Sequence, residues 1–123
     1  MARFLHDHHI TMRDRDYYIV FPNDDILMGL HRSIRVYSMD KESIRAIGGP
    51  IGTVRDMWKW VAEVGDGYWS YTDIRCSREN EKIQRMFDRP EPVAFLFTDR
   101  ETAYNFRFRY GDKISPNPVK VEF

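Results

Sequence analysis

Two short apolar runs constrain the fold of this chain more than any other feature of its sequence. The first, DYYIVFP, extends from Asp16 to Pro22, and the second, PVAFLFT, extends from Pro92 to Thr98. Both consist mainly of β-branched and aromatic residues, which predicts strands. Because the apolar residues follow one another without interruption, we expect both faces of these strands to be covered. The two runs therefore predict a sheet whose central strands are buried on both sides.

The length of the chain allows one domain. Its 123 residues can enclose one hydrophobic core but are too few for two ordinary domains. Hydrophobic residues make up 42% of the sequence and aromatic residues 15%, which is typical of a folded protein and excludes a disordered tail. No repeat, low-complexity tract or linker divides the sequence, so we expect a single α+β domain over residues 1–123.

Cysteine usage and hydropathy indicate the compartment. Cys76 is the only cysteine, so no internal disulfide can form, which favours a reducing, intracellular environment. No apolar run approaches the roughly 20 residues of a membrane span. The N-terminal sequence MARFLHDHH lacks the apolar core of a signal peptide. These observations predict a cytoplasmic protein that does not contact a membrane.

The stretch GTVRDMWKWVAEVGDG carries the clearest helical pattern in the chain. Thr53 is expected to cap this helix and Gly65 to stop it. Apolar residues recur at the spacing of one helix face, and the side chains predicted to point inward are Val54, Met57, Trp58 and Val61.

Residues Thr98 to Asp112, TDRETAYNFRFRYGD, fit two incompatible patterns. A period of two predicts a strand with its aromatic residues on one face. A period of 3.6 predicts a helix with an apolar stripe of Ala103, Phe106 and Tyr110 and a polar stripe of Arg100, Tyr104 and Arg107. Thr98 and Glu101 match a capping box, and Gly111 stands where a left-handed stop is expected. Since TDRETA contains no turn residue for a hairpin, we predict the helix.

The remaining patterns complete an α+β fold. Asn23 or Asp24 is expected to cap a short helix with Ile26, Leu27 and Leu30, and Ser77 to begin another with Ile83, Met86 and Phe87 inward. Further strands are predicted within residues 2–12, 33–39, 68–76 and 117–123. Because several strands are polar on one face, we expect a mixed or antiparallel sheet with about three helices packed on one side.

The histidines near the N-terminus are the cluster that most resembles a reactive site. In a strand, His6 and His8 project to the same side, a spacing that can hold a divalent metal ion, with His9 or Asp7 as the third ligand. A solvated segment explains the same residues. Neither a convergent set of catalytic residues nor a nucleotide-binding fingerprint is found, which favours a protein that is not an enzyme and needs no cofactor.

Arginines suggest a second class of function. Arginine outnumbers lysine 14 to 5, and the helix predicted after Thr98 carries Arg100, Arg107 and Arg109. Such side chains can stack on bases or hold phosphates. PVAFLFTDRETAYNF is similar to the third strand and second helix of an RNA-recognition motif, but the Lys/Arg-Gly-Phe-Gly-Phe pattern of that family is missing. The formal net charge of zero provides no general attraction to nucleic acid. Nucleic-acid binding is therefore the alternative hypothesis.

Residues 97–111, FTDRETAYNFRFRYG, resemble a closing pattern of short uncharacterised proteins of tailed bacteriophages. In those proteins an acidic turn, an Ala, a Phe and an aromatic-Gly end recur after a strand. The resemblance covers fifteen of the 123 residues and implies a phage accessory protein that acts in the host cytoplasm. It implies no catalytic residue.

The leading hypothesis from the sequence is a small interaction protein that binds a protein of the host. Tyr, Trp and Arg are enriched at binding hot spots, and this chain has many of them outside the predicted inward stripes. Pairing of two copies across a two-fold axis is a further expectation, through an aromatic sheet face or the C-terminal strand. The residues predicted to contact a protein partner are Trp60, Trp69, Tyr71, Tyr104 and Arg107.

Overall fold

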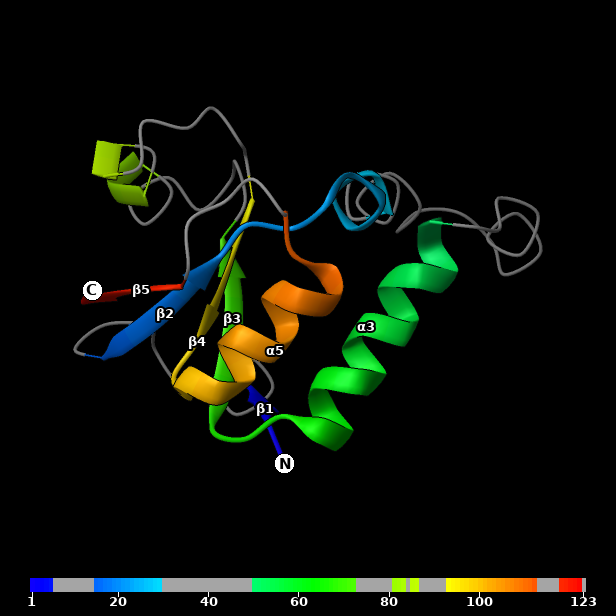
Figure 1. The fold of residues 1–123 in the computed structure, drawn as a ribbon, viewed down its shortest axis with the longest axis horizontal. Helices are drawn as coiled ribbons and strands as arrows, with labels where there is room; N and C mark the ends of the chain where they lie inside the picture. The colour runs from blue at the N-terminus through cyan, green and yellow to red at the C-terminus, as the bar shows by residue number, and fades with distance from the viewer. Residues whose placement is uncertain are drawn as a thin grey trace.

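The computed structural model describes residues 1–5, 15–29, 50–72, 81–83, 85–86, 93–112 and 118–122 of the protein. These residues form a five-stranded sheet with helices packed against it (Figure 1). No helix among them combines the length and apolar character needed to cross a bilayer. The strands are β1 (Arg3–Phe4), β2 (Asp16–Val20), β3 (Tyr68–Thr72), β4 (Ala94–Phe97) and β5 (Val119–Glu122). The longest helices are α3 (Pro50–Val64) and α5 (Arg100–Tyr110), and residues 24–29, 81–83 and 85–86 are also helical.

The two apolar runs form the centre of the sheet, as predicted. The strand order is β1-β3-β4-β2-β5, so β4 and β2 each have a neighbour on both sides. β1 pairs with β3 in parallel, whereas the β3–β4, β4–β2 and β2–β5 pairs are antiparallel. The register places Ile19 opposite Leu96, and both side chains are buried. The predicted mixed sheet is therefore confirmed.

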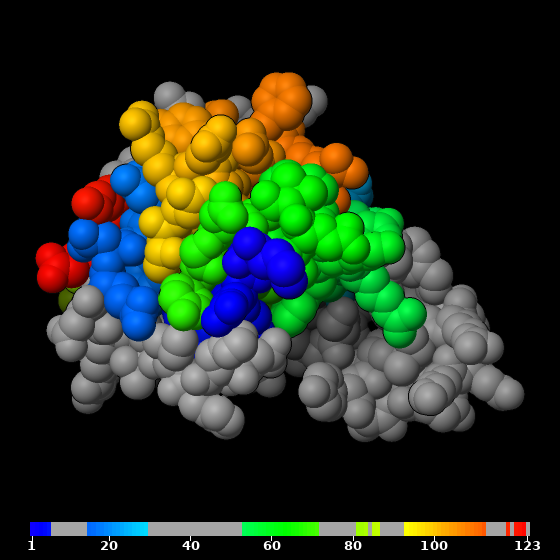
Figure 2. Space-filling model, turned by 90° about the horizontal axis from the view of Figure 1, so that it is seen from below, coloured from blue at the N-terminus to red at the C-terminus, as the bar shows by residue number. Residues whose placement is uncertain are grey.

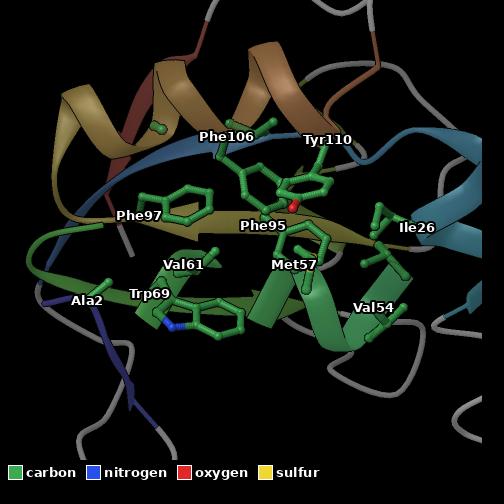
Figure 3. Close-up of a cluster of buried hydrophobic side chains, with 13 residues drawn as sticks. Ala2, Ile26, Val54, Met57, Val61, Trp69, Phe95, Phe97, Phe106 and Tyr110 are labelled. Atoms are coloured by element: carbon green, nitrogen blue, oxygen red, sulfur yellow. The ribbon is translucent and has the colours of Figure 1, made fainter. Parts of the chain in front are cut away.

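The two faces of the sheet are buried by different parts of the chain. Because side chains alternate along a strand, Phe95 and Phe97 of β4 face the helices while Leu96 faces the opposite side. The cluster under the helices also contains Ile26 of the helix at 24–29 (Figure 3), so three helices pack on one side as expected, whereas the helical residues 81–83 place Ile83 on the other face. On the opposite face Leu96 packs in a cluster with Leu5, Tyr17, Ile19, Phe21, Ile83, Ala94 and Val121.

Helix α3 covers the β1–β3 half of the sheet with the face predicted from its spacing. Val54, Met57 and Val61 are buried, and Trp58 is half-buried. The predicted first residue of the helix is wrong, because α3 begins at Pro50 and Thr53 lies inside it. Proline is favoured at the first helical position, because a backbone N–H there would have no acceptor within the helix.

Gly65 follows the last residue of α3, but it does not have the left-handed backbone of a glycine stop. Gly67 is the described glycine with a positive φ, at 71°. At Gly65 the constraint is space: an added Cβ would lie 2.9 Å from both the Ala2 Cβ and the Thr102 Cγ2. This glycine therefore lets the end of α3, the N-terminal segment and α5 approach one another.

The shorter elements agree with the sequence pattern in part. The Asn23 side-chain oxygen accepts a hydrogen bond from the Ile26 N–H at 2.9 Å, which confirms Asn23 as a helix cap. Ile83 is buried as predicted, but Met86 is 51% exposed, so its predicted inward position is wrong. The strand expected at 33–39, the ends of several predicted elements, and Leu30, Cys76, Ser77 and Phe87 lie outside the described residues.

Candidate protein-interaction surface

Helix α5 carries Tyr104 and Arg107 of the predicted protein contacts and the three arginines of the alternative nucleic-acid site, and its first turn fixes its orientation. The helix predicted for this stretch is confirmed, but its cap is Asp99 and not Thr98. Asp99 Oδ2 accepts hydrogen bonds from the Thr102 N–H at 3.0 Å and from the Thr102 hydroxyl at 2.7 Å. The Thr98 hydroxyl oxygen instead accepts from the Tyr68 N–H of β3 at 2.8 Å, which ties the helix start to the sheet.

The end of α5 is held by close packing. Gly111 has a φ of −83°, so the expected left-handed stop is wrong. Its N–H donates to the Arg107 carbonyl at 3.0 Å. An added Cβ would lie 2.7 Å from that same oxygen, which is too close for a side chain.

The rotation of α5 separates a buried face from a strongly exposed one. Thr102, Ala103, Phe106 and Tyr110 are buried, which confirms the predicted apolar stripe. The opposite side presents Phe108, whose side chain is 91% exposed, the largest exposed fraction of any large hydrophobic residue among those described. Phe108 is two residues after Phe106, and two residues rotate a helix by about 200°. The same helical pattern that buries Phe106 therefore places Phe108 in solvent.

Two arginines of α5, Arg100 and Arg109, lie against aromatic rings. The Arg100 guanidinium lies 5.3 Å from the centroid of the Tyr104 ring. The Arg109 guanidinium lies 5.9 Å from the Trp60 ring of α3 and 5.4 Å from the Tyr110 ring. Arg109 Nε also donates a hydrogen bond to the Tyr110 hydroxyl at 3.0 Å. Each contact is worth roughly 0.5–1 kcal/mol at an exposed site. Arg109 is adjacent to Phe108 in the sequence and Arg100 lies about two helical turns before it, each with its guanidinium group against a ring.

The contact with Tyr104 also favours the charged form of Arg100. The hydrogen bond between Arg100 and Tyr104 raises the pKa of the arginine further above its ordinary value. The exposed and half-buried charged residues of α5 are Arg100, Arg107, Arg109 and one acid, Glu101. The outer part of this helix thus carries an excess of positive charge, although the whole chain is neutral.

The three arginines of α5 do not form one continuous stripe. Arg100 lies on the side of the helix toward β2, where it interacts electrostatically with Tyr18. Arg109 lies on the side toward α3, against Trp60. The expected stripe of Arg100, Arg107 and Arg109 is therefore divided between two sides of α5. The nine residues from Arg100 to Arg109 make about two and a half helical turns, which places the two side chains on opposite sides.

The structure places the five predicted contact residues in different environments. Tyr104 and Arg107 are half-buried on α5, and Trp60 is half-buried at the α3–α5 contact, 5.7 Å from the Tyr110 ring. Tyr71 is half-buried and packs 6.0 Å from the rings of both Phe4 and Phe95. The expected exposure of Trp69 is wrong, since its side chain is 2% exposed in the core.

Trp69 is buried because the edge of the sheet is covered at this point. Phe4 of β1 lies 4.6 Å from the Trp69 ring, and Trp58 of α3 lies 4.8 Å from it (ring centroids). The sequence places Trp69 and Tyr71 on one strand face but does not show that α3 packs on that face. Trp69 is therefore a core residue, and Tyr71 lies at the margin of the same cluster.

The sequence-based hypothesis did not include Phe108. The available signal was the helical period itself, since Phe108 falls opposite the stripe of Ala103, Phe106 and Tyr110. A residue that large and apolar at the solvent-facing position conflicts with the amphipathic pattern of a surface helix. Such conflicts are expected at functional surfaces.

The proposed metal ligands His6, His8 and His9 lie outside the described residues. Within the described ranges no group of three or more His, Cys, Asp or Glu side chains could hold a metal ion.

The surface formed by Phe108, Arg100, Tyr104 and Arg109 with Trp60 is called here the α5 surface. Figure 2 shows α5 (yellow to orange) at the exterior of the molecule. An exposed ring on a helix that also carries arginines can enter an apolar pocket while the guanidinium groups bind carboxylates of the same partner. Comparison of the chain with family models, with curated proteins and with solved structures found no match.

Proposed function

We propose that this protein is a small interaction protein whose α5 surface binds a partner protein, with Phe108 as the central contact. The observation that carries the proposal is the 91% exposure of Phe108 on a helix whose other aromatic residues are buried or half-buried. Burying a phenylalanine side chain from water contributes about 1.5–3 kcal/mol. A partner that buries Phe108 would obtain this free energy, because the side chain stays exposed when the chain folds.

The residues around Phe108 support a protein as the partner. Hot spots consist of aromatic and arginine anchors surrounded by contacts that exclude water. Tyr104 and Trp60 supply rigid rings, and Arg100 and Arg109 are already held against them, so little side-chain freedom is lost on binding. The complementary surface is an apolar pocket bordered by Asp or Glu side chains.

The proposal extends to the setting in which the protein acts. The resemblance of residues 97–111 to phage accessory proteins falls on α5 itself, which supports a host protein as the partner. Binding would then take place in the host cytoplasm. Nucleic-acid binding through Arg100, Arg107 and Arg109 gains less support, since these side chains lie on two sides of the helix.

Site-specific photo-crosslinking tests the proposal. A benzoylphenylalanine at position 108 is expected to capture a defined protein species, whereas the same residue at Met28, an exposed apolar position on another helix, is not. The captured protein is then purified and titrated against the wild-type chain and Phe108→Ala. Loss of a hot spot is worth about 2 kcal/mol, so the variant should bind roughly thirtyfold more weakly.

Two results would contradict the proposal. One is equal affinity of Phe108→Ala and the wild type for the captured protein. The other is a gel shift of single-stranded RNA or DNA that weakens steeply with salt and is lost in Arg100→Ala and Arg107→Ala, because this dependence indicates phosphate contacts. Met28→Ala serves as the matched control and should retain full affinity for the protein partner.

A further inference from the structure

The outer strand β5 has a charge pattern that is complementary to itself. β5 is the last strand in the sheet and pairs with β2, its neighbour among the described strands. Figure 2 shows β5 (red) at the side of the molecule with β2 (blue) next to it. Lys120 and Glu122 are exposed and, being two residues apart, project from the same face of the strand. Backbone groups at such an edge are a template for a further strand.

An antiparallel pair of two β5 strands selects one register. With the two-fold axis at Val121, Lys120 of each copy lies opposite Glu122 of the other copy. This dimer contains two cross-strand pairs of opposite charge, one on each side of the axis. A register centred on Lys120 or on Glu122 would instead place two like charges opposite each other.

Within one copy, Glu122 faces an acid on the adjacent strand, and two lysines, Lys82 and Lys120, also interact with it. The β2–β5 register sets Asp16 opposite Glu122, two acids on adjacent strands. Lys120 lies 3.2 Å from the Asp16 carboxylate, where it forms an ion pair. Like charges directly opposite each other destabilise a sheet. A lysine from a second copy next to Glu122 would offset this repulsion.

The helical residues at 81–83 and 85–86 lie beside the same edge. Lys82 Nζ donates a hydrogen bond to the backbone carbonyl of Glu122, so this acceptor already has a partner, and the second strand would have to displace Lys82 from it. Met86 is four residues after Lys82, which places it on the same side of the helical turn. Its side chain is 51% exposed. A strand paired with β5 would cover apolar surface there.

We propose that two copies of this chain associate through antiparallel pairing of β5 with β5, centred on Val121, so that one sheet continues through both molecules. A second copy is the partner at this edge, because in the antiparallel pair Lys120 of each copy lies opposite Glu122 of the other. The described part of β5 is four residues long, so the contact is small and the dimer is weak and concentration-dependent. This association is separate from the α5 surface and does not depend on its function.

Charge reversal at the edge tests the dimer. Sedimentation velocity of the wild-type chain should show a monomer that becomes a dimer as concentration rises. Lys120→Glu places acids opposite acids, and Glu122→Lys places lysines opposite lysines, so each variant should dimerise roughly tenfold more weakly or not at all. An equimolar mixture of the two variants should restore the dimer, because each charge then faces its opposite in the other variant.

Control measurements separate this effect from misfolding. Glu122→Lys replaces the repulsion with Asp16 by an attraction, so its thermal stability should equal or exceed that of the wild type while dimerisation is lost. Phe108→Ala should dimerise like the wild type. A wild-type chain that stays monomeric, a mixture that does not dimerise, or a dimer abolished by Phe108→Ala and unaffected by charge reversal would each overturn the proposal.

Discussion

Phe106 and Phe108 are two residues apart on α5 and lie in opposite environments. Phe106 is fully buried, with its ring 4.9 Å from the rings of both Phe95 and Phe97. Phe108 is 91% exposed. The residue type is the same, so hydrophobicity alone does not decide which ring enters the core. The rotation of the helix, fixed by its contacts with the sheet and α3, decides it.

The strand β2 shows the same contrast with a different period. Tyr17 is fully buried on the face away from α5, and its neighbour Tyr18 is half-buried on the other face. Adjacent residues of a strand point to opposite sides of the sheet. In both elements, therefore, the buried ring serves stability and its neighbour remains at or near the surface.

The largest expected effect comes from truncating the buried ring of this pair. Phe106→Ala should lower the free energy of unfolding by about 3–5 kcal/mol, because it removes apolar contacts and leaves a cavity. Urea denaturation followed by circular dichroism measures this change. A loss below about 1 kcal/mol, the size of an ordinary substitution, would show that Phe106 is not at the centre of the core.

The buried tyrosine makes stability depend on pH. Burial raises the pKa of Tyr17 to about 12, although nearby Arg15 acts to lower it. The unfolded chain releases this proton near its ordinary pKa of 10, earlier than the folded protein, so stability should fall as the pH rises from about 10 to 12. Denaturation at several pH values measures the slope, and Tyr17→Phe should make it shallower. An unchanged slope would contradict the assignment to Tyr17.

The orientation of α5 depends on its cap, and this dependence can be measured. Asp99→Ala should destabilise the protein by about 0.5–2 kcal/mol, because Thr102 loses the acceptor of both hydrogen bonds that it donates to Asp99. Asp99→Asn is the matched control, since it retains a side-chain acceptor and should lose less. Equal stability of Asp99→Ala and the wild type in thermal denaturation would remove Asp99 as the determinant of the helix start.

The smallest expected effect on stability is that of the exposed ring. Phe108→Ala should change the free energy of unfolding by less than about 0.5 kcal/mol, because a surface side chain has few contacts to lose. Its effect on partner binding is expected to be much larger. If instead Phe108→Ala unfolds at clearly lower denaturant, the ring stabilises the fold and the contrast with Phe106 no longer holds.

Much of the fold was predictable because local patterns carried the information. The uninterrupted runs around Ile19 and Leu96 indicated central strands, and the spacing of Val54, Met57 and Val61 indicated the buried face of α3. The stretch after Thr98 was ambiguous by periodicity, and the absence of turn residues favoured the helix that is observed. The cap residues were less predictable, because Thr98 and Asp99 are both good caps and only the contact with Tyr68 separates their roles.

The candidate surface was less predictable than the fold. Tyr104 and Arg107 were placed on the outer part of α5 by the helical period alone. Trp69 was misplaced, because its burial depends on β1 and α3, which are distant in sequence. Phe108 was missed, although the helical period places it opposite the buried stripe of α5.

The sequence by itself determined the type and order of the main elements, since periodicity, turn residues and apolar runs act over a few neighbouring positions. Tertiary structure alone decided which aromatic rings are covered, because this depends on packing between segments far apart in the chain. It also decided that β5 is the outermost of the described strands on its side of the sheet, which is the position from which the proposed pairing with a second copy follows.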